Sequence, residues 1–120
     1  MKKYAIIGAG PAGAKAAETL RRLDAESKIT IVTTERYPFY RRERIAGLIS
    51  GEETEEGLFE KGMDFFEKIG AELVTDQVTR VSSEKNQLTL GASSSIDYDC
   101  LLVASGGKPI LPHWPGIQLD

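Results

Sequence analysis

The chain has 120 residues, with Lys+Arg 15 against Asp+Glu 18, so its formal net charge is −3. This length fits one domain, and the mild acidity argues against a nucleic-acid partner, because domains that bind phosphate backbones are usually basic. The single cysteine, Cys100, excludes an internal disulfide and a cysteine-based zinc site, favours a reducing, cytoplasmic location, and leaves no predicted metal site. No apolar run approaches the roughly 20 residues that span a bilayer, so we expect no membrane segment.

The N-terminal part of the chain has the pattern of a strand, a helix and a second strand. Residues 4–7 form a short apolar run that stops at a glycine, as a buried parallel strand does. Pro11 suits the first turn of a helix, and apolar residues then recur at helical spacing up to Leu23. Residues 28–34 are rich in β-branched side chains, which favour a strand. Together these elements predict a βαβ unit with a right-handed crossover.

The region from residue 37 to residue 70 is predicted to be a loop followed by helices. Residues 37–44 hold aromatic and arginine side chains without a clear period, so we interpret them as a functional loop or a surface connection. A short helix is predicted over 45–50, and the acidic run after it is interpreted as a solvated helix start. Apolar residues at spacings of three and four then predict one helix that ends at Gly70 and packs in the core: Leu58, Phe59, Met63, Phe65, Phe66 and Ile69.

Strand patterns dominate the chain after residue 70. Residues 71–74 predict a third parallel strand, and residues 77–81 and 87–90 alternate in polarity, which predicts a hairpin or meander followed by a turn over 91–95. Residues 100–104 are continuously apolar and predict a buried strand, in which we expect Cys100 to be an inert thiol. The prolines of residues 108–120 predict an extended exit segment.

The strongest motif lies between the first predicted strand and the first predicted helix, and reads Gly8-Ala9-Gly10-Pro11-Ala12-Gly13. In this context Gly8 permits a tight turn, Gly10 lets the backbone approach a pyrophosphate, and Gly13 lets helix and strand pack closely. The amide groups and dipole of the helix would then face the phosphates. The motif therefore predicts a dinucleotide site, with a simple glycine turn as the alternative.

Glu35 stands at the end of the second predicted strand. A carboxylate at this point can accept hydrogen bonds from both ribose hydroxyls of an adenosine, and it would repel the extra phosphate of NADP. The alternative is an exposed loop glutamate.

Two further stretches have recognisable patterns. Residues 97–109 place tyrosine and aspartate before an apolar strand that ends Ala104-Ser105-Gly106, with a proline soon after. Residues 40–45 and 49–51 contain Arg42, followed by Glu43. With the glycine motif, these stretches resemble the N-terminal FAD-binding part of the pyridine nucleotide-disulfide oxidoreductase family. The branch they resemble contains NADH:rubredoxin reductases, nitrite reductase large subunits and ferredoxin reductases. Here serine replaces the family's usual threonine, and Glu43 replaces its usual proline.

The resemblance implies a fold and a set of binding residues. The fold is α/β, a Rossmann-like FAD/NAD(P)-binding domain with a parallel sheet, flanking helices and an antiparallel β-meander crossover. Residues 1–120 would be its N-terminal part, truncated before the NAD-binding domain, with 108–120 as the exit segment. The implied cofactor-binding residues are Gly8, Gly10, Pro11, Ala12 and Gly13 at the pyrophosphate, Glu35 and Arg36 at the adenosine, Val78 at the adenine through its backbone, Arg42 at the FAD, and Ala104, Ser105 and Gly106 close to the cofactor. A buried strand valine is the alternative interpretation of Val78.

The resemblance also implies a function for the whole protein. NAD(P)H would give a hydride to FAD, and the electrons would leave to an acceptor that the sequence does not identify. Residues 36–70 contain no cysteine, so we expect no thiol chemistry in this segment and assign no catalytic residue. The chain has one GxGxxG motif and lacks the family's later Gly-Asp segment. We therefore expect it to be inactive by itself, and to have an uncovered sheet edge that favours a homodimer.

Two other functions stay open. One is an NAD-binding Rossmann module of a dehydrogenase or sensor, which would need neither the meander after Val78 nor the 98–106 stretch. The other is a non-enzymatic domain that has lost the cofactor, against which the intact glycines and Glu35 argue.

Overall fold

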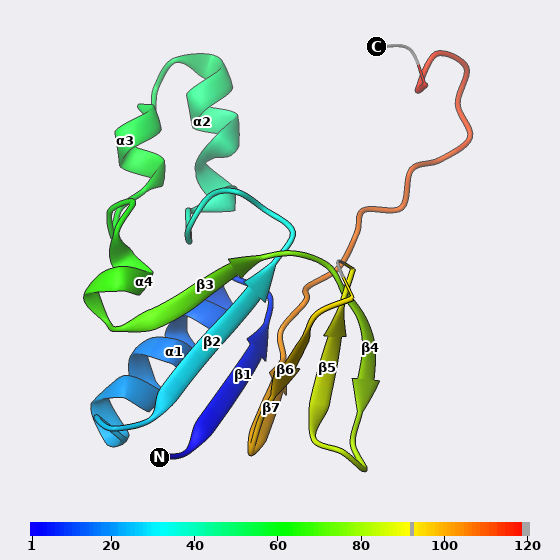
Figure 1. Cartoon of the computed structure of the whole chain (residues 1–120). Helices are drawn as coiled ribbons and strands as arrows, with labels where there is room; N and C mark the ends of the chain where they lie inside the picture. Colours follow the sequence, from blue (N-terminus) through cyan, green and yellow to red (C-terminus); the bar gives the residue numbers. More distant parts are fainter. Residues whose placement is uncertain (92, 119–120) are drawn as a thin grey trace.

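The computed structural model of the chain describes residues 1–91 and 93–118. Figure 1 shows two sheets, a long helix that lies against the larger sheet, and short helices, of which α2 and α3 project from the body. In chain order the elements are β1 (Lys3–Ile7), α1 (Pro11–Leu23), β2 (Lys28–Thr33), the 3₁₀ turn η1 (Arg42–Arg44), α2 (Ile45–Ser50), α3 (Glu55–Leu58), α4 (Phe65–Lys68), β3 (Ala71–Thr75), β4 (Val78–Ser82), β5 (Gln87–Leu90), β6 (Ser95–Asp97) and β7 (Cys100–Val103). Among the described residues, no helix is both long and apolar enough to cross a bilayer.

The larger sheet is parallel and has the strand order β3-β2-β1-β7. α1 covers one face of it, where Ile6 and Ile31 pack against the small side chains of Ala14 and Ala17. Small residues on the inner side of α1 let the helix approach the sheet closely. The predicted α/β fold and its first βαβ unit are confirmed.

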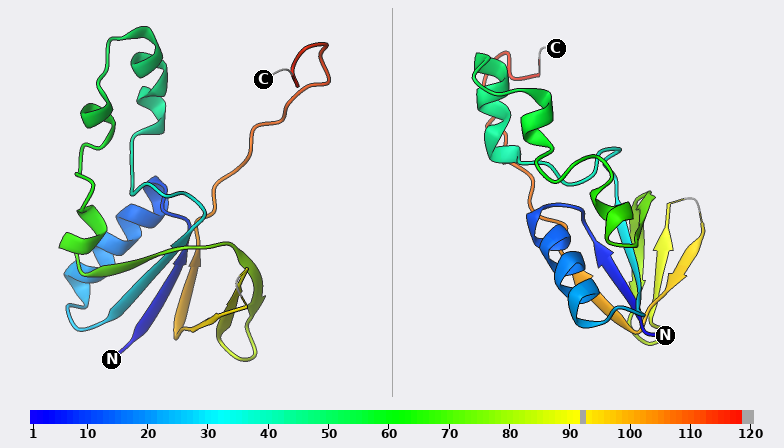
Figure 2. Two further views of the ribbon diagram at one scale, coloured as in Figure 1. Left: turned by 45° about the horizontal axis from the view of Figure 1, so that its top comes forward. Right: turned by 90° about the vertical axis from the view of Figure 1, so that its left-hand side faces the viewer.

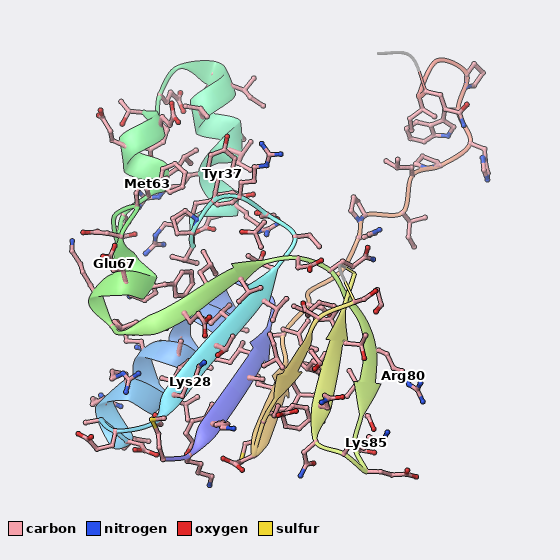
Figure 3. The ribbon with its side chains drawn as sticks, in the orientation of Figure 1. Lys28, Tyr37, Met63, Glu67, Arg80 and Lys85 are labelled. Carbon is pink, nitrogen blue, oxygen red and sulfur yellow. The ribbon has the colours of Figure 1, made fainter. Side chains whose placement is uncertain are left out.

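The smaller sheet covers the opposite face, as the second view in Figure 2 shows. It is the antiparallel meander β4-β5-β6, and its Leu88 and Leu90 pack against Ala5 and Val32 of the parallel sheet. Arg80 of β4 and Lys85 of the turn between β4 and β5 point to solvent (Figure 3). The predicted meander is thus confirmed. The predicted turn over 91–95 extended too far, because Ser95 already pairs within β6; Ala92 of that turn lies outside the described residues.

The single helix predicted up to Gly70 is wrong. α3 ends at Leu58, and α4 begins only at Phe65. Between them Gly62 has a φ of +83° and its N–H donates to the carbonyl of Phe59 at 2.7 Å. A left-handed residue cannot continue a right-handed helix, so the chain turns here. The core role is confirmed for Leu58, Phe65 and Phe66, which are buried, whereas Met63 is 58% exposed.

Polar side chains of α1 fasten α4 to the body of the molecule. The Arg21 guanidinium donates to the carbonyls of Ile69 (2.8 Å) and Gly70 (3.0 Å), just after α4. Glu18 pairs with Lys15 at 2.9 Å and with Lys61 at 3.0 Å, and the hydrogen bonds from these lysines lower the pKa of Glu18 to about 2. The Arg21 contacts and the Lys61–Glu18 pair join segments more than forty residues apart in sequence.

The strand β7 lies at an edge of the parallel sheet and, within residues 1–91 and 93–118, pairs on one side only, with β1. Cys100 is therefore exposed, and its predicted burial is wrong. Val103, on the same strand, is 62% exposed. Beyond β7 the chain leaves the body from the end where α2 and α3 also project (Figure 1). Residues 108–118 of the predicted exit segment form no helix or strand, and residues 119–120 lie outside the described part.

Candidate functional site

A cavity of about 690 Å³ lies where the parallel strands end. The carboxyl ends of β1, β2, β3 and β7 meet at one edge of the sheet, and the strand order reverses direction between β1 and β7. In open α/β sheets a ligand crevice forms at this kind of switch point. Most of the predicted site residues line the cavity: Gly8, Gly10, Pro11, Ala12, Glu35, Arg42, Val78, Ala104, Ser105 and Gly106.

The turn between β1 and α1 has space only for glycine at two positions. Gly8 has a φ of +104°, and a Cβ atom there would lie 2.2 Å from the carbonyl oxygen of Ala104. Its N–H donates to Val32 at 2.8 Å, so the turn is held between β2 and the end of β7. A Cβ on Gly13 would lie 2.0 Å from the oxygen of Gly8, which explains why α1 can pass so close to the turn.

The N-terminus of α1 opens into the cavity without a cap of its own. Gly10 is the N-cap residue, and the first turn contains no acidic residue; among the residues that the structure describes, no side chain caps this helix end. The first helical hydrogen bond runs from Ala14 to Gly10 at 2.9 Å, which leaves the amides of Ala12 and Gly13 without a helical acceptor. A Cβ on Gly10 would meet nothing within 4 Å, so the backbone here is open to a ligand. Free amides at the positive end of a helix suit a phosphate.

Glu35 lies one strand away from this turn, just beyond the end of β2. Its carboxylate forms an ion pair with Arg42 of η1, and the Arg42 guanidinium lies over the Tyr40 ring, 5.2 Å from its centroid. Burial raises the pKa of the Tyr40 hydroxyl, and the negative charge of Glu35 raises it further. Tyr40 is therefore neutral over the physiological range, and Arg42 is held between an aromatic face and a carboxylate.

The other predicted residues divide by position. Val78 and the segment Ala104–Gly106 line the cavity, whereas Gly13 is buried beneath the turn. Arg36 is exposed and is not among the described residues that line the cavity. Sequence reasoning missed several lining residues: Thr33, Thr34, Asp76, Gln77 and Lys108. The ends of the predicted second and third strands could have indicated all but Lys108, because the carboxyl ends of parallel strands converge.

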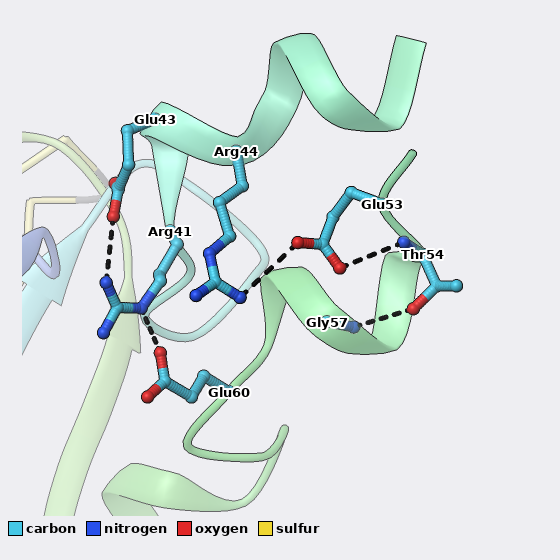
Figure 4. A network of polar contacts seen from close by, with 7 residues as sticks. All are labelled: Arg41, Glu43, Arg44, Glu53, Thr54, Gly57 and Glu60. Atoms are coloured by element: carbon cyan, nitrogen blue, oxygen red, sulfur yellow. Dashed lines mark hydrogen bonds and ion pairs between the residues drawn. The ribbon is translucent and has the colours of Figure 1, made fainter. Parts of the chain in front are cut away.

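Two other arginines of the 37–44 loop, Arg41 and Arg44, form ion pairs outside the cavity. Figure 4 shows Arg41 paired with Glu43 and Glu60, and Arg44 paired with Glu53. α3 is capped by Thr54, whose hydroxyl accepts from the Gly57 amide at 3.1 Å. These contacts hold the projecting segment of α2 and α3 together, away from the cavity.

Comparison with known proteins finds a matching family model, similar sequences and similar structures, all of oxidoreductases. The family model for pyridine nucleotide-disulphide oxidoreductases matches residues 2–120. A probable ferredoxin reductase, CtmF, of Castellaniella defragrans is 32% identical over 120 residues, which cover 98% of this chain and 29% of that protein. The NADH-rubredoxin oxidoreductase of Clostridium acetobutylicum is 31% identical, over 92% of this chain and 30% of its own length. The structure of an NAD-dependent persulfide reductase from A. fulgidus superposes with a TM-score of 0.90 and 26% identity, covering 98% of this chain and 24% of that one. The chain thus spans less than a third of each of these proteins.

Proposed function

This chain belongs to the pyridine nucleotide-disulphide oxidoreductase family, and we propose that its residues 1–120 bind FAD in the cavity at the carboxyl ends of the parallel strands. FAD is the cofactor of this family, with NAD(P)H as substrate, and when bound it supplies the redox chemistry. One observation carries the proposal: the uncapped N-terminus of α1 opens, at Gly10, into a cavity large enough for a dinucleotide.

Each part of the cavity is proposed to hold one part of the cofactor. The amides of Ala12 and Gly13 would bind the diphosphate, with Arg42 supplying a compensating positive charge. Glu35 would accept the ribose hydroxyls of the adenosine, and the backbone of Val78 would meet the adenine. The segment Ala104–Gly106 would pass beside the flavin half, and Arg36 would approach the adenosine from outside the lining.

For the whole protein we propose a cytoplasmic flavoprotein oxidoreductase that passes electrons from NAD(P)H through FAD to an acceptor. The names of its relatives include a ferredoxin reductase and a rubredoxin reductase, which supports a small redox protein as that acceptor. One GxGxxG motif serves one dinucleotide, so the nicotinamide nucleotide would bind outside residues 1–120.

Titration of the purified 120-residue chain with FAD, FMN and NAD tests this proposal. We expect FAD to bind most tightly, because FMN lacks the adenosine half that Glu35 would hold, and NAD lacks the flavin half. No steady-state NADH oxidation is expected with added FAD. A preference for NAD without FAD uptake would favour the NAD-module alternative, and NADH turnover at ordinary enzyme rates would refute the need for a second nucleotide site.

We also propose that the isolated chain pairs with a second copy along β7. The strand carries no charged residue, and beside it an apolar groove of about 340 Å³ runs between β7 and α1. Uncharged, uncovered edges favour strand pairing. Val103→Lys is expected to shift the chain towards monomer in sedimentation, whereas Val81→Lys, at an exposed valine of the meander, is not. A monodisperse monomer of the unaltered chain at high concentration would contradict this pairing.

A further inference from the structure

Thr33 is the last residue of β2 and stands where that strand leaves the sheet. Its carbonyl accepts the Asp76 amide at 2.9 Å, so its backbone is fixed to the end of β3. Its side chain is buried, and its hydroxyl oxygen accepts the backbone N–H of Glu35 at 3.2 Å. A threonine hydroxyl that accepts an amide two residues ahead sets the conformation of the intervening turn.

That turn determines where Glu35 points. Beyond Thr33 the chain has no further ladder partner in β3, and Thr34 is exposed. Glu35 is therefore placed by two contacts at opposite ends of the residue, the Thr33 hydroxyl on its amide and Arg42 on its carboxylate. Arg42 is an exposed residue of the short turn η1, whereas Thr33 is buried at the end of β2, so the more rigid of the two restraints is the hydroxyl.

We propose that Thr33 is a positioning residue for adenosine recognition, whose hydroxyl aims the Glu35 carboxylate at the ribose of the bound nucleotide. This inference rests on the proposed function. It predicts an effect on ligands that carry a ribose and none on a bare diphosphate, because the helix N-terminus that would hold the phosphates is built from β1 and α1 rather than from Thr33.

The test compares Thr33→Val and Thr33→Ser in the 120-residue chain, with ADP and inorganic pyrophosphate as probes in calorimetric titrations. Valine keeps the branched shape but loses the acceptor, and serine keeps the hydroxyl. Thr33→Val is expected to weaken ADP binding about fivefold, the effect of one ordinary hydrogen bond, and to leave pyrophosphate binding unchanged. Thr33→Ser is expected to bind ADP as the unaltered chain does.

Two controls separate positioning from a structural effect. Thr30→Val makes the same change at another buried threonine of β2, whose hydroxyl bonds to Glu72, and should leave ADP affinity unchanged. In a Glu35→Ala background, Thr33→Val should cause no further loss. Equal weakening of ADP and pyrophosphate, unchanged ADP affinity in Thr33→Val, or an additive loss beside Glu35→Ala would overturn the inference. If the unaltered chain binds no ADP, the proposed function itself fails.

Discussion

Gly13→Ala is expected to destabilise the chain by about 3 kcal/mol, because the added methyl group has no space. Its carbon would lie 2.0 Å from the Gly8 oxygen and 3.3 Å from the side chain of Ile6. The nearest obstacle is backbone, which cannot rotate away as the end of a flexible side chain does. Either α1 must move off the sheet or the turn at Gly8 must open. The higher helix propensity of alanine, about 1 kcal/mol, offsets only part of this cost. Urea unfolding of the two chains measures the difference.

Moving α1 off the sheet would also disturb Ala14 and Ala17, since both are buried against the sheet. A lifted α1 would uncover them and expose apolar surface that now lies between helix and strands. Gly10→Ala is the matched control, because its Cβ meets nothing within 4 Å and its φ of −73° suits alanine. If Gly13→Ala unfolds at the same urea concentration as the unaltered chain, the close packing of α1 on the turn is wrong.

Gly10→Ala, in contrast to Gly13→Ala, is expected to lose little stability but much of its ligand affinity. Replacing glycine by alanine at a helix N-cap costs no more than about 1 kcal/mol of stability. The methyl group, however, would stand in the space through which a diphosphate reaches the amides of Ala12 and Gly13. We expect FAD and ADP affinities to fall at least roughly tenfold, because the backbone can no longer approach the phosphates. Calorimetric titration and urea unfolding of the same preparation measure both quantities.

Gly107→Ala is the control for this substitution. Gly107 also lines the cavity, and a Cβ there also meets nothing within 4 Å, but it belongs to the segment after β7 and not to the turn that leads into α1. It should retain ADP affinity. Equal affinity of Gly10→Ala and the unaltered chain for ADP would mean that the ligand does not bind at this helix end.

The sequence predicted the parts of the fold that local patterns determine. The run from Tyr4 to Gly13 combines an apolar strand, a glycine turn and a helix start, and each signal agrees with the others. The alternating polarity of residues 77–81 and 87–90 likewise predicted the antiparallel pair β4 and β5 of the meander. In both cases the periodicity belongs to one element and needs no distant partner.

The predictions that failed depend on features that a local pattern does not carry. The apolar spacing from Leu58 to Ile69 is helical, but Gly62 adopts a left-handed conformation and splits the segment. The apolar run at Cys100 is typical of a buried strand, yet β7 has one neighbour and lies at the edge. The number of strands that pair with a given strand depends on the topology of the whole sheet, which a local sequence pattern does not show.

The candidate site divides in the same way. The backbone part, from Gly8 to Gly13, could be predicted because glycine spacing is itself the geometric requirement. The side-chain part could be predicted only as separate residues. The pairing of Glu35 with Arg42, and the hydroxyl of Thr33 beneath Glu35, follow from how a loop folds back over the strand ends.

In the proposed complex, the amides at the start of α1 bind the diphosphate of FAD, while Glu35 binds the ribose beside it. The most direct measurement is a titration of the ¹⁵N-labelled chain with FAD, followed through the amide chemical shifts of every assigned residue. We expect saturable changes that are largest from Gly8 to Gly13 and at Glu35. Largest changes along the β7 groove, at Tyr4 and Leu102, or no saturable change at all, would contradict it.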